Sequence, residues 1–166
     1  MSRAFIKEDA GDEGQPERRQ PSGPNYVTPR GLKLLRRKVA ALEESCAGKS
    51  REEQRDLRYW RARLAAAVLI DAPVKPPEDI RFGAVVEVKD AAGKTQTLRI
   101  VGQDEAEEEG EGGSRVAWDS AIGRALIGLR AGDKATWNDG EVERQLVVVS
   151  VRYLADDGDA TVAERQ

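Results

Sequence analysis

The amino-acid sequence predicts an α+β fold, with a pair of helices near the N-terminus followed by a small β-rich domain. Between residues 28 and 68, apolar residues recur at helical spacing in two stretches joined by a short glycine-containing turn. After residue 79, short runs of β-branched residues alternate with turn sequences, interrupted by one glycine-flanked helical segment at 120–128. These observations predict an antiparallel α-helical hairpin and then an antiparallel β-sheet domain with one short helix.

Five segments are expected along the chain. Residues 1–24 are rich in glycine, proline and charged residues, and they bury too little apolar area to offset the entropy cost of ordering, so a disordered arm is expected. The helical hairpin is assigned to 25–72, a stiff proline-rich linker to 73–79 and the β-rich domain to 80–154. A flexible tail is expected at 155–166.

The first helix is expected to begin with Thr28 as its N-cap residue and Pro29 at its first helical position. Apolar residues then recur in steps of three or four and form one stripe: Leu32, Leu35, Val39 and Leu42. The helix is expected to end near Cys46, where a turn at residues 47–50 follows.

The second helix is expected to begin with a capping box, because Glu53 follows Ser50 by three residues. Its apolar stripe consists of Leu57, Trp60, Leu64, Ala67 and Val68. Each helix would then have about 18 residues and a length of about 27 Å. Tyr59 neighbours Trp60 and points in another direction on a helix, so it is expected at the surface.

Short strands are expected at 84–88, 95–101, 115–118, 134–137 and 141–154, with the helix at 120–128 among them. Turn sequences at 89–94 and 138–140 join neighbouring strands into hairpins. In the helix, Ile122 and Leu126 are expected to pack against the sheet, while Gly123 and Gly128 allow close packing and end the helix.

The composition excludes several classes of function. The chain of 166 residues has no histidine, which removes histidine-based acid–base catalysis, histidine-containing triads and most zinc sites. Its single cysteine forms no internal disulfide. No apolar run approaches the roughly 20 residues of a membrane span, and residues 1–10 lack a signal-peptide core. A cytoplasmic protein without membrane contact is therefore expected.

Charge is divided unevenly along the chain. The formal net charge is −3, but residues 26–69 hold 11 Lys/Arg and 5 Asp/Glu (+6), whereas residues 78–154 hold 10 and 15 (−5). A protein with this division can present opposite charges to two parts of a partner. The alternative is charge scattered over the surface without a binding role.

Four segments carry a family pattern. They are Asn-Tyr-Val-Thr-Pro-Arg-Gly at 25–31, Arg-Ile-Val-Gly-Gln-Asp-Glu-Ala at 99–106, Asp-Ser-Ala-Ile-Gly-Arg-Ala-Leu-Ile-Gly at 119–128 with Gly-Asp at 132–133, and Gly-Glu at 140–141 with the strand at 149–153. Together they resemble the Gre family of bacterial transcription elongation factors, GreA and GreB. The resemblance covers about residues 25 to 153 in the family's order, and the segment at 119–128 is its most specific part.

The resemblance implies an N-terminal coiled-coil finger and a C-terminal domain with an FKBP-like fold. In the family, the C-terminal domain grips the rim of the secondary channel of RNA polymerase and the finger enters that channel. Acidic residues at the fingertip hold a second Mg²⁺ in the polymerase active site and promote cleavage of backtracked RNA. The resemblance therefore implies RNA polymerase as the partner, with RNA or DNA contact within the transcription complex, and a monomer is expected.

The sequence departs from the family in two places. The fingertip pattern Gly-Asp-x-x-Glu-Asn-Ala-Glu-Tyr is absent, and the hairpin is shorter. The family's Asp-Ser-Pro at the rim contact is here Asp119, Ser120 and Ala121. With Trp118, these residues are the candidate polymerase-binding site, although Trp118 could equally fill the core of the β-rich domain.

Basic residues on the hairpin are candidates for contact with the channel or with nucleic acid: Arg36, Arg37, Lys38, Arg51, Arg55 and Arg58. Arg61 and Arg63 lie on the same helices, and the alternative for all eight is a solvated face with ordinary ion pairs. Glu52 and Glu53 are the metal-ligand candidates, but the helix dipole favours acids at this position without any metal. No catalytic residue and no cofactor are expected, and the acidic run at 104–111 is expected to be a solvated loop.

These observations predict an RNA polymerase-binding regulator of elongation that acts at the secondary channel, is not itself an enzyme and does not strongly stimulate transcript cleavage. One alternative is a true cleavage factor whose hairpin-tip carboxylates hold Mg²⁺. Another is a peptidyl-prolyl isomerase, suggested by the implied fold alone. That activity needs an aromatic-lined pocket, which a chain with 5% aromatic residues can hardly assemble.

Overall fold

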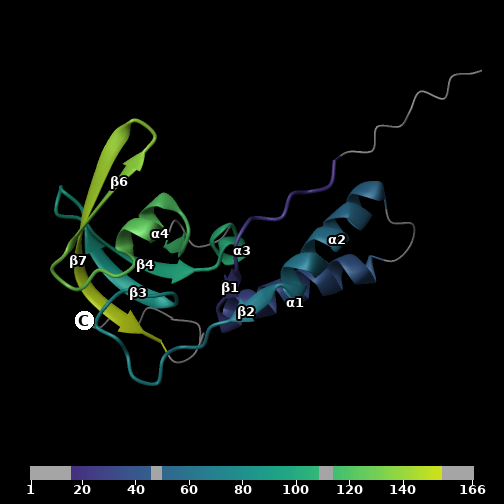
Figure 1. Cartoon of the computed structure of the whole chain (residues 1–166), viewed down its shortest axis with the longest axis horizontal. Coiled ribbons are helices and arrows are strands. Elements are labelled where there is room, and N and C mark those ends of the chain that lie inside the picture. Colours follow the sequence, from purple (N-terminus) through teal and green to yellow (C-terminus); the bar gives the residue numbers. More distant parts are fainter. Residues whose placement is uncertain (1–15, 46–49, 109–113, 155–166) are drawn as a thin grey trace, which may run out of the picture.

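We describe the protein from a computed structural model, in which residues 16–45, 50–108 and 114–154 are described. The elements in chain order are β1 (Asn25–Val27), α1 (Pro29–Glu44), α2 (Arg51–Ala65), β2 (Ala67–Leu69), β3 (Ala84–Lys89), β4 (Thr95–Val101), α3 (Gln103–Ala106), β5 (Arg115–Ala117), α4 (Ala121–Leu126), β6 (Lys134–Asp139) and β7 (Val142–Tyr153). Figure 1 shows the two long helices at one end and the larger sheet at the other. The predicted α+β class is confirmed, and the tail at 155–166 and most of the expected arm lie outside the described residues.

Both long helices begin where the sequence predicts. The Thr28 hydroxyl oxygen accepts a hydrogen bond from the Gly31 N–H at 3.0 Å. At the start of α2, Ser50 Oγ accepts from the Glu53 N–H at 3.2 Å, and the Glu53 carboxylate accepts from the Ser50 N–H at 2.8 Å. The helices have 16 and 15 residues, and α1 ends at Glu44, before the predicted end near Cys46.

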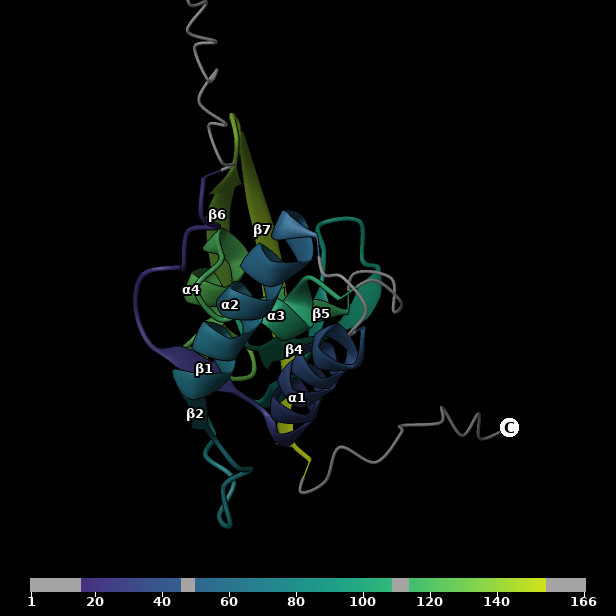
Figure 2. The same ribbon diagram turned by 90° about the vertical axis from the view of Figure 1, so that its right-hand side faces the viewer.

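The helix pair has its own apolar core, and one prediction about it is wrong. Leu35, Val39, Leu57 and Trp60 are buried together, as the two stripes predict. Tyr59 is only 6% exposed and belongs to the same core, with its ring edge-on to Trp60 at a centroid distance of 5.0 Å. The expected surface position of Tyr59 is incorrect because the chain before β1 and α3 both lie on that side of α2. Figure 2, viewed from the helix end, shows α1 and α2 side by side.

Two strands that the sequence pattern did not indicate join the ends of the helix pair. β1 and β2 pair in parallel, with Asn25 opposite Ala67 and Val27 opposite Leu69. Ala67 and Val68 therefore belong to a strand instead of the apolar stripe of α2, and Val68 is exposed. The pairing closes the helix pair at its base.

The second domain is a five-stranded sheet in the order β5-β4-β3-β7-β6 that curls around α4 (Figure 1). The strands lie within a few residues of the predicted positions. β4 and β5 pair in parallel, so the sheet is mixed and the expectation of a purely antiparallel sheet is wrong. The reason is a second short helix, α3, which lies in the connection that carries the chain back to the start of β5.

The sheet and α4 share the main apolar core. Leu126 is fully buried in this core and Ile122 packs against it, as predicted. Gly123 allows α4 to lie directly on the preceding turn, because a Cβ there would be 2.2 Å from the Ala117 carbonyl oxygen. Gly128 has a φ of +88°, a conformation that glycine adopts at little cost after a helix. No helix among the described residues has the length and apolar character needed to cross a membrane.

Candidate functional site

Two of the four segments that carry the family pattern meet at the junction between the helix pair and the sheet. Gly102 lies against β1 so closely that a Cβ would be 2.4 Å from the Tyr26 carbonyl oxygen. Thr28 Oγ1 donates to Glu105 Oε2 at 2.6 Å, and Glu105 is almost completely buried. Gly31 faces the same carboxylate, since a Cβ there would be 3.0 Å from Glu105 Oε2. The acidic run at 104–111 is therefore partly structural, and the expectation of a fully solvated loop is wrong for its first two residues.

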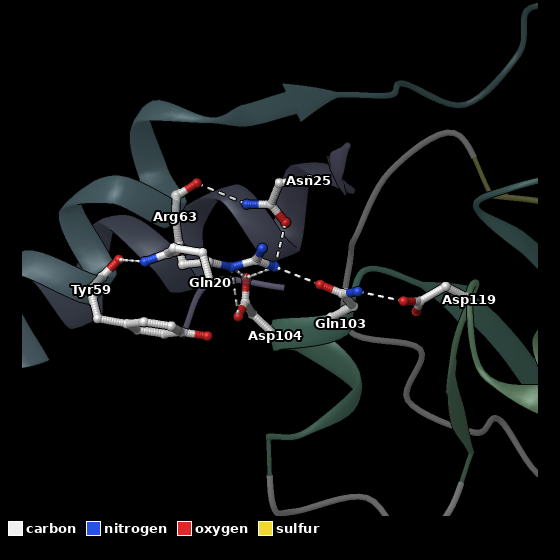
Figure 3. A network of polar contacts seen from close by, with 7 residues as sticks. All are labelled: Gln20, Asn25, Tyr59, Arg63, Gln103, Asp104 and Asp119. Carbon is white, nitrogen blue, oxygen red and sulfur yellow. Dashed lines mark hydrogen bonds and ion pairs between the residues drawn. The ribbon is translucent and has the colours of Figure 1, made fainter. Parts of the chain in front are cut away.

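A buried arginine holds this junction together (Figure 3). Arg63, in the last turn of α2, is 2% exposed, and its Nε donates to both Asp104 carboxylate oxygens at 2.9 and 3.2 Å. Its Nη2 donates to Asn25 Oδ1 at 2.6 Å and to Gln103 Oε1 at 3.0 Å. Asn25 Nδ2 in turn donates to the Arg63 carbonyl oxygen at 2.8 Å. Arg63 thus has a structural role and is not available for contact with nucleic acid.

The same network reaches the candidate loop between β5 and α4. The Gln103 side-chain amide donates to Asp119 Oδ2, so the loop is connected to α2 through one side chain (Figure 3). Ser120 caps α4, because its Oγ accepts from the Gly123 N–H at 3.1 Å and donates to the Ala117 carbonyl oxygen at 2.7 Å. Ala121, where the family has proline, is exposed at the start of α4.

Trp118 lies between β1 and the core of the sheet. Its ring is 5.3 Å from that of Tyr26, which is 6.0 Å from that of Phe82, and it also packs against the core of the sheet. Its side chain is half-buried. The structure thus places Trp118 at the edge of the core, next to Asp119, and its contact with a partner remains a prediction.

A cavity that the sequence reasoning missed lies beside Ile122, in the first turn of α4. It has a volume of about 580 Å³ and opens between α4 and the β6–β7 hairpin. Ile122, Trp137 and Leu146 provide its apolar wall, and Glu143 and Arg144 lie at its polar side. The only signal in the sequence was Trp137, which stands among polar residues on the short strand β6. That signal does not reveal that α4 lies on the opposite side of the cavity.

The basic candidates are spread over both long helices. Arg36 and Arg37 are exposed on α1, whereas Lys38 Nζ lies 4.3 Å from the centroid of the Trp60 ring. On α2, Arg58 forms an ion pair with Glu17.

Arg51, the first residue of α2, is exposed. Arg55 lies 3.8 Å from both Glu52 and Asp56. Ordinary ion pairs therefore involve part of this set, and contact with a channel or nucleic acid remains a prediction.

The two metal-ligand candidates are placed in different surroundings. The Glu53 carboxylate caps the backbone of α2 and also accepts from Ser45 Oγ at 3.4 Å. The Glu52 side chain is 70% exposed and lies beside Arg55. Within the described residues, no group of three or more acidic or cysteine side chains is suited to hold a metal ion. Residues 46–49, between the helices, lie outside the described part of the chain.

The C-terminal half of the chain resembles a known protein family. Residues 75–153 match the family described as "Transcription elongation factor, GreA/GreB, C-term". GreB of Neisseria meningitidis (serogroup A) is 34% identical over 108 residues, which cover 64% of each chain. GreA of Methylococcus capsulatus is 44% identical over 96 residues, which cover 56% of this chain and 58% of that protein. The chain thus spans slightly less than two thirds of the length of these relatives.

Solved structures also match this chain. The GreA factor homolog 1 (Gfh1) of Thermus thermophilus is 20% identical, with a TM-score of 0.40, and the match covers 78% of this chain and 99% of that protein. A GreA/GreB elongation factor from Nitrosomonas europaea has the same TM-score at 19% identity, with 80% and 100% covered. On the evidence of the sequence matches, residues 75–153 are similar to the C-terminal part of the GreA/GreB transcription elongation factors.

Proposed function

We propose that this protein is a regulator of transcription elongation that binds RNA polymerase at the rim of its secondary channel. The sequence match over 75–153 carries the proposal, because it contains residues 118–121, the candidate docking loop. The geometry of that loop supports it. Ser120 Oγ accepts a hydrogen bond from the Gly123 N–H at the start of α4, and the Gln103 amide donates one to the Asp119 carboxylate. Ala121 is exposed. The apolar cavity beside Ile122 enlarges the surface that a partner can contact.

The helix pair acts as the finger in this proposal. It is a short coiled coil that enters the channel while an FKBP-like C-terminal domain remains at the rim. The exposed arginines of α1 and α2 would face the anionic surroundings of nucleic acid and bound nucleotides. The protein would act in the cytoplasm as a monomer, with five proposed structural parts bounded at residues 24, 72, 79 and 154.

Strong stimulation of transcript cleavage is not part of the proposal. That chemistry requires Mg²⁺, which needs several oxygen ligands in close, near-octahedral geometry. Glu53 already accepts hydrogen bonds at the start of α2, and Glu52 lies beside Arg55. These residues do not fit a magnesium site, so no step of the mechanism is assigned to the metal.

A binding experiment tests the docking surface. Bacterial core RNA polymerase is immobilised, and retention of the full chain is compared with that of Asp119→Arg and Glu141→Arg. We expect Asp119→Arg to weaken binding at least tenfold, because it replaces a negative charge of the candidate docking loop with a positive one. Glu141→Arg likewise replaces a carboxylate with a positive charge, but in an exposed turn between β6 and β7, and this variant should bind like the wild type. Failure of the wild-type chain to bind would refute the proposal.

A second experiment separates regulation from cleavage. Stalled elongation complexes are incubated with the chain, and the shortening of the transcript is followed over time. We expect little stimulation, and no change in Glu52→Ala/Glu53→Ala. Strong stimulation that disappears in the double variant would instead identify a cleavage factor that uses these two carboxylates.

A further inference from the structure

A second cavity lies at the junction, on the side of Asp119 that faces α2. Its volume is about 300 Å³, and Tyr59, Asp104, Glu107 and Asp119 supply its polar groups. Pro21, Ala106 and Ala117 contribute apolar wall. The cavity therefore combines an aromatic ring, apolar surface and three carboxylates beside the proposed docking loop.

The Tyr59 hydroxyl gives this cavity an unused polar group. Tyr59 is 6% exposed, and in Figure 3 its phenol ring extends from α2 towards Asp104. Among residues 16–45, 50–108 and 114–154, the hydroxyl makes no hydrogen bond. Tyr59 lines the cavity, so its hydroxyl can both accept and donate a hydrogen bond to a group that enters there. Burial, followed by the negative charge of Asp104, raises the pKa of Tyr59 above its ordinary value.

The charges around the cavity show which kind of ligand fits. Both Asp104 oxygens bond to Arg63, which compensates that charge. Asp119 bonds to the neutral amide of Gln103, and Glu107 is exposed, so these two carboxylates keep their negative charge towards the cavity. An incoming group should therefore be a cation that can also donate hydrogen bonds.

The chain itself shows that this surface accepts a guanidinium group. Arg18 places its guanidinium carbon 4.1 Å from the centroid of the Tyr59 ring and 5.3 Å from that of Trp60. A guanidinium group stacks on aromatic rings and binds carboxylates through a planar set of donors, whereas an ammonium group is a strongly hydrated point charge. The neighbouring cavity offers the same ring together with its hydroxyl and two carboxylates.

We propose that this cavity binds an arginine side chain of the protein that docks on residues 118–121. The Tyr59 hydroxyl and the carboxylates of Glu107 and Asp119 accept hydrogen bonds from the guanidinium, and the apolar walls contact its methylene groups. The identity of that protein as RNA polymerase rests on the proposed function. The chemistry of the cavity does not depend on it.

A titration without polymerase tests the cavity directly. N-acetyl-arginine methylamide is added to the full ¹⁵N-labelled chain, and N-acetyl-citrulline methylamide serves as a neutral probe of nearly the same shape. We expect the arginine probe to shift the amide signals of Tyr59, Glu107 and Asp119, and the citrulline probe to leave them unchanged. Equal shifts with both probes, or none with either, would refute the proposal.

Two variants and one matched control sharpen the test. Tyr59→Phe removes only the hydroxyl, and Glu107→Gln removes one charge, so each should weaken binding of the arginine probe about tenfold. Glu108→Gln changes the neighbouring carboxylate, which does not line the cavity, and should bind like the wild type. A similar loss in Glu108→Gln would show only general attraction by the acidic run and would overturn the proposal.

The same variants are then compared for affinity to core RNA polymerase. Weaker binding of Tyr59→Phe and Glu107→Gln, but not of Glu108→Gln, supports the proposal. If the wild type binds and all three variants bind equally well, the arginine site is refuted while the proposed function stands. If the wild type itself does not bind, the proposed function fails, and the titration alone decides whether the cavity is a guanidinium site.

Discussion

Two arginines of α2 (Arg51–Ala65) serve different purposes. At the end next to the sheet, Arg63 is buried and bonds to Asp104, Asn25 and Gln103. Less than two turns away, the Arg58 side chain is 57% exposed and pairs with Glu17 on the surface. Arg63 fixes how the helix pair joins the sheet. Arg58 makes only an exposed ion pair, so its side chain stays on the surface of the helix. The number and spacing of the arginines along the helix do not reveal this division.

The largest expected effect is at the buried end. Arg63→Ala leaves the Asp104 carboxylate buried without its partner, and loss of one member of such a pair costs about 3–5 kcal/mol of folding free energy. Urea denaturation followed by tryptophan fluorescence measures this loss. Arg58→Ala is the matched control, and it should cost at most about 1 kcal/mol, because the ion pair of Arg58 is exposed. Equal losses would show that the buried and the exposed arginine do not differ in their contribution to stability.

A smaller loss is expected from Gly102→Ala, which tests the same junction through the backbone. The added methyl group would lie 2.4 Å from the Tyr26 carbonyl oxygen, so β1 and the start of α3 must move apart. Overpacking of this kind costs about 1–3 kcal/mol. Chemical denaturation measures the cost, and unchanged stability would mean that the junction is loosely packed.

Ser50→Ala tests the far end of the helix pair. It removes the N-cap hydrogen bond of α2 and should cost about 1 kcal/mol, while hydrogen exchange at Arg63 stays slow. Circular dichroism during thermal unfolding and amide exchange measure the two effects. The control, Glu52→Gln, changes an exposed acid in the same turn and should cost only a few tenths of a kcal/mol. Faster exchange at Arg63 in Ser50→Ala would show that the two ends are coupled.

The smallest effect concerns pH. Because the pKa of Tyr59 is raised in the folded state, its contribution to stability is fully present below about pH 10 and is lost as the pH rises through the folded-state pKa. Tyr59→Phe should therefore lose less stability between about pH 10 and 12 than the wild type does. Burial also raises the pKa of Tyr153, so that residue must remain unchanged in both proteins. Identical pH profiles would contradict the prediction.

Local signals predicted much of the fold. Both N-caps of the long helices, the position of α4 and the positions of the longer strands follow from capping residues, apolar spacing and turn sequences. β1 and β2 did not, because three-residue strands carry no pattern and their parallel partners are far apart in the chain. α3 was missed for a similar reason, since its four residues are mainly polar.

The candidate site was predicted less completely. The motif at 119–128 contains the candidate docking loop, but the roles of Asn25, Arg63 and Gln103 depend on three segments that meet only in the folded protein. The acidic run illustrates the difficulty. Composition alone indicates a solvated loop, whereas Asp104 is buried because its cationic partner comes from α2. Burial of a charge is decided by an element elsewhere in the chain, which a local pattern does not contain.

The parallel pairing of β1 with β2 has a consequence for how such proteins can vary. The chain enters and leaves the helix pair at one fixed anchorage, so helical turns can be inserted or deleted at the opposite end without changing that anchorage. Each turn added to both helices alters the reach by about 5.4 Å. Under the proposed function, the depth to which the helix pair enters its partner can thus vary independently of the docking surface.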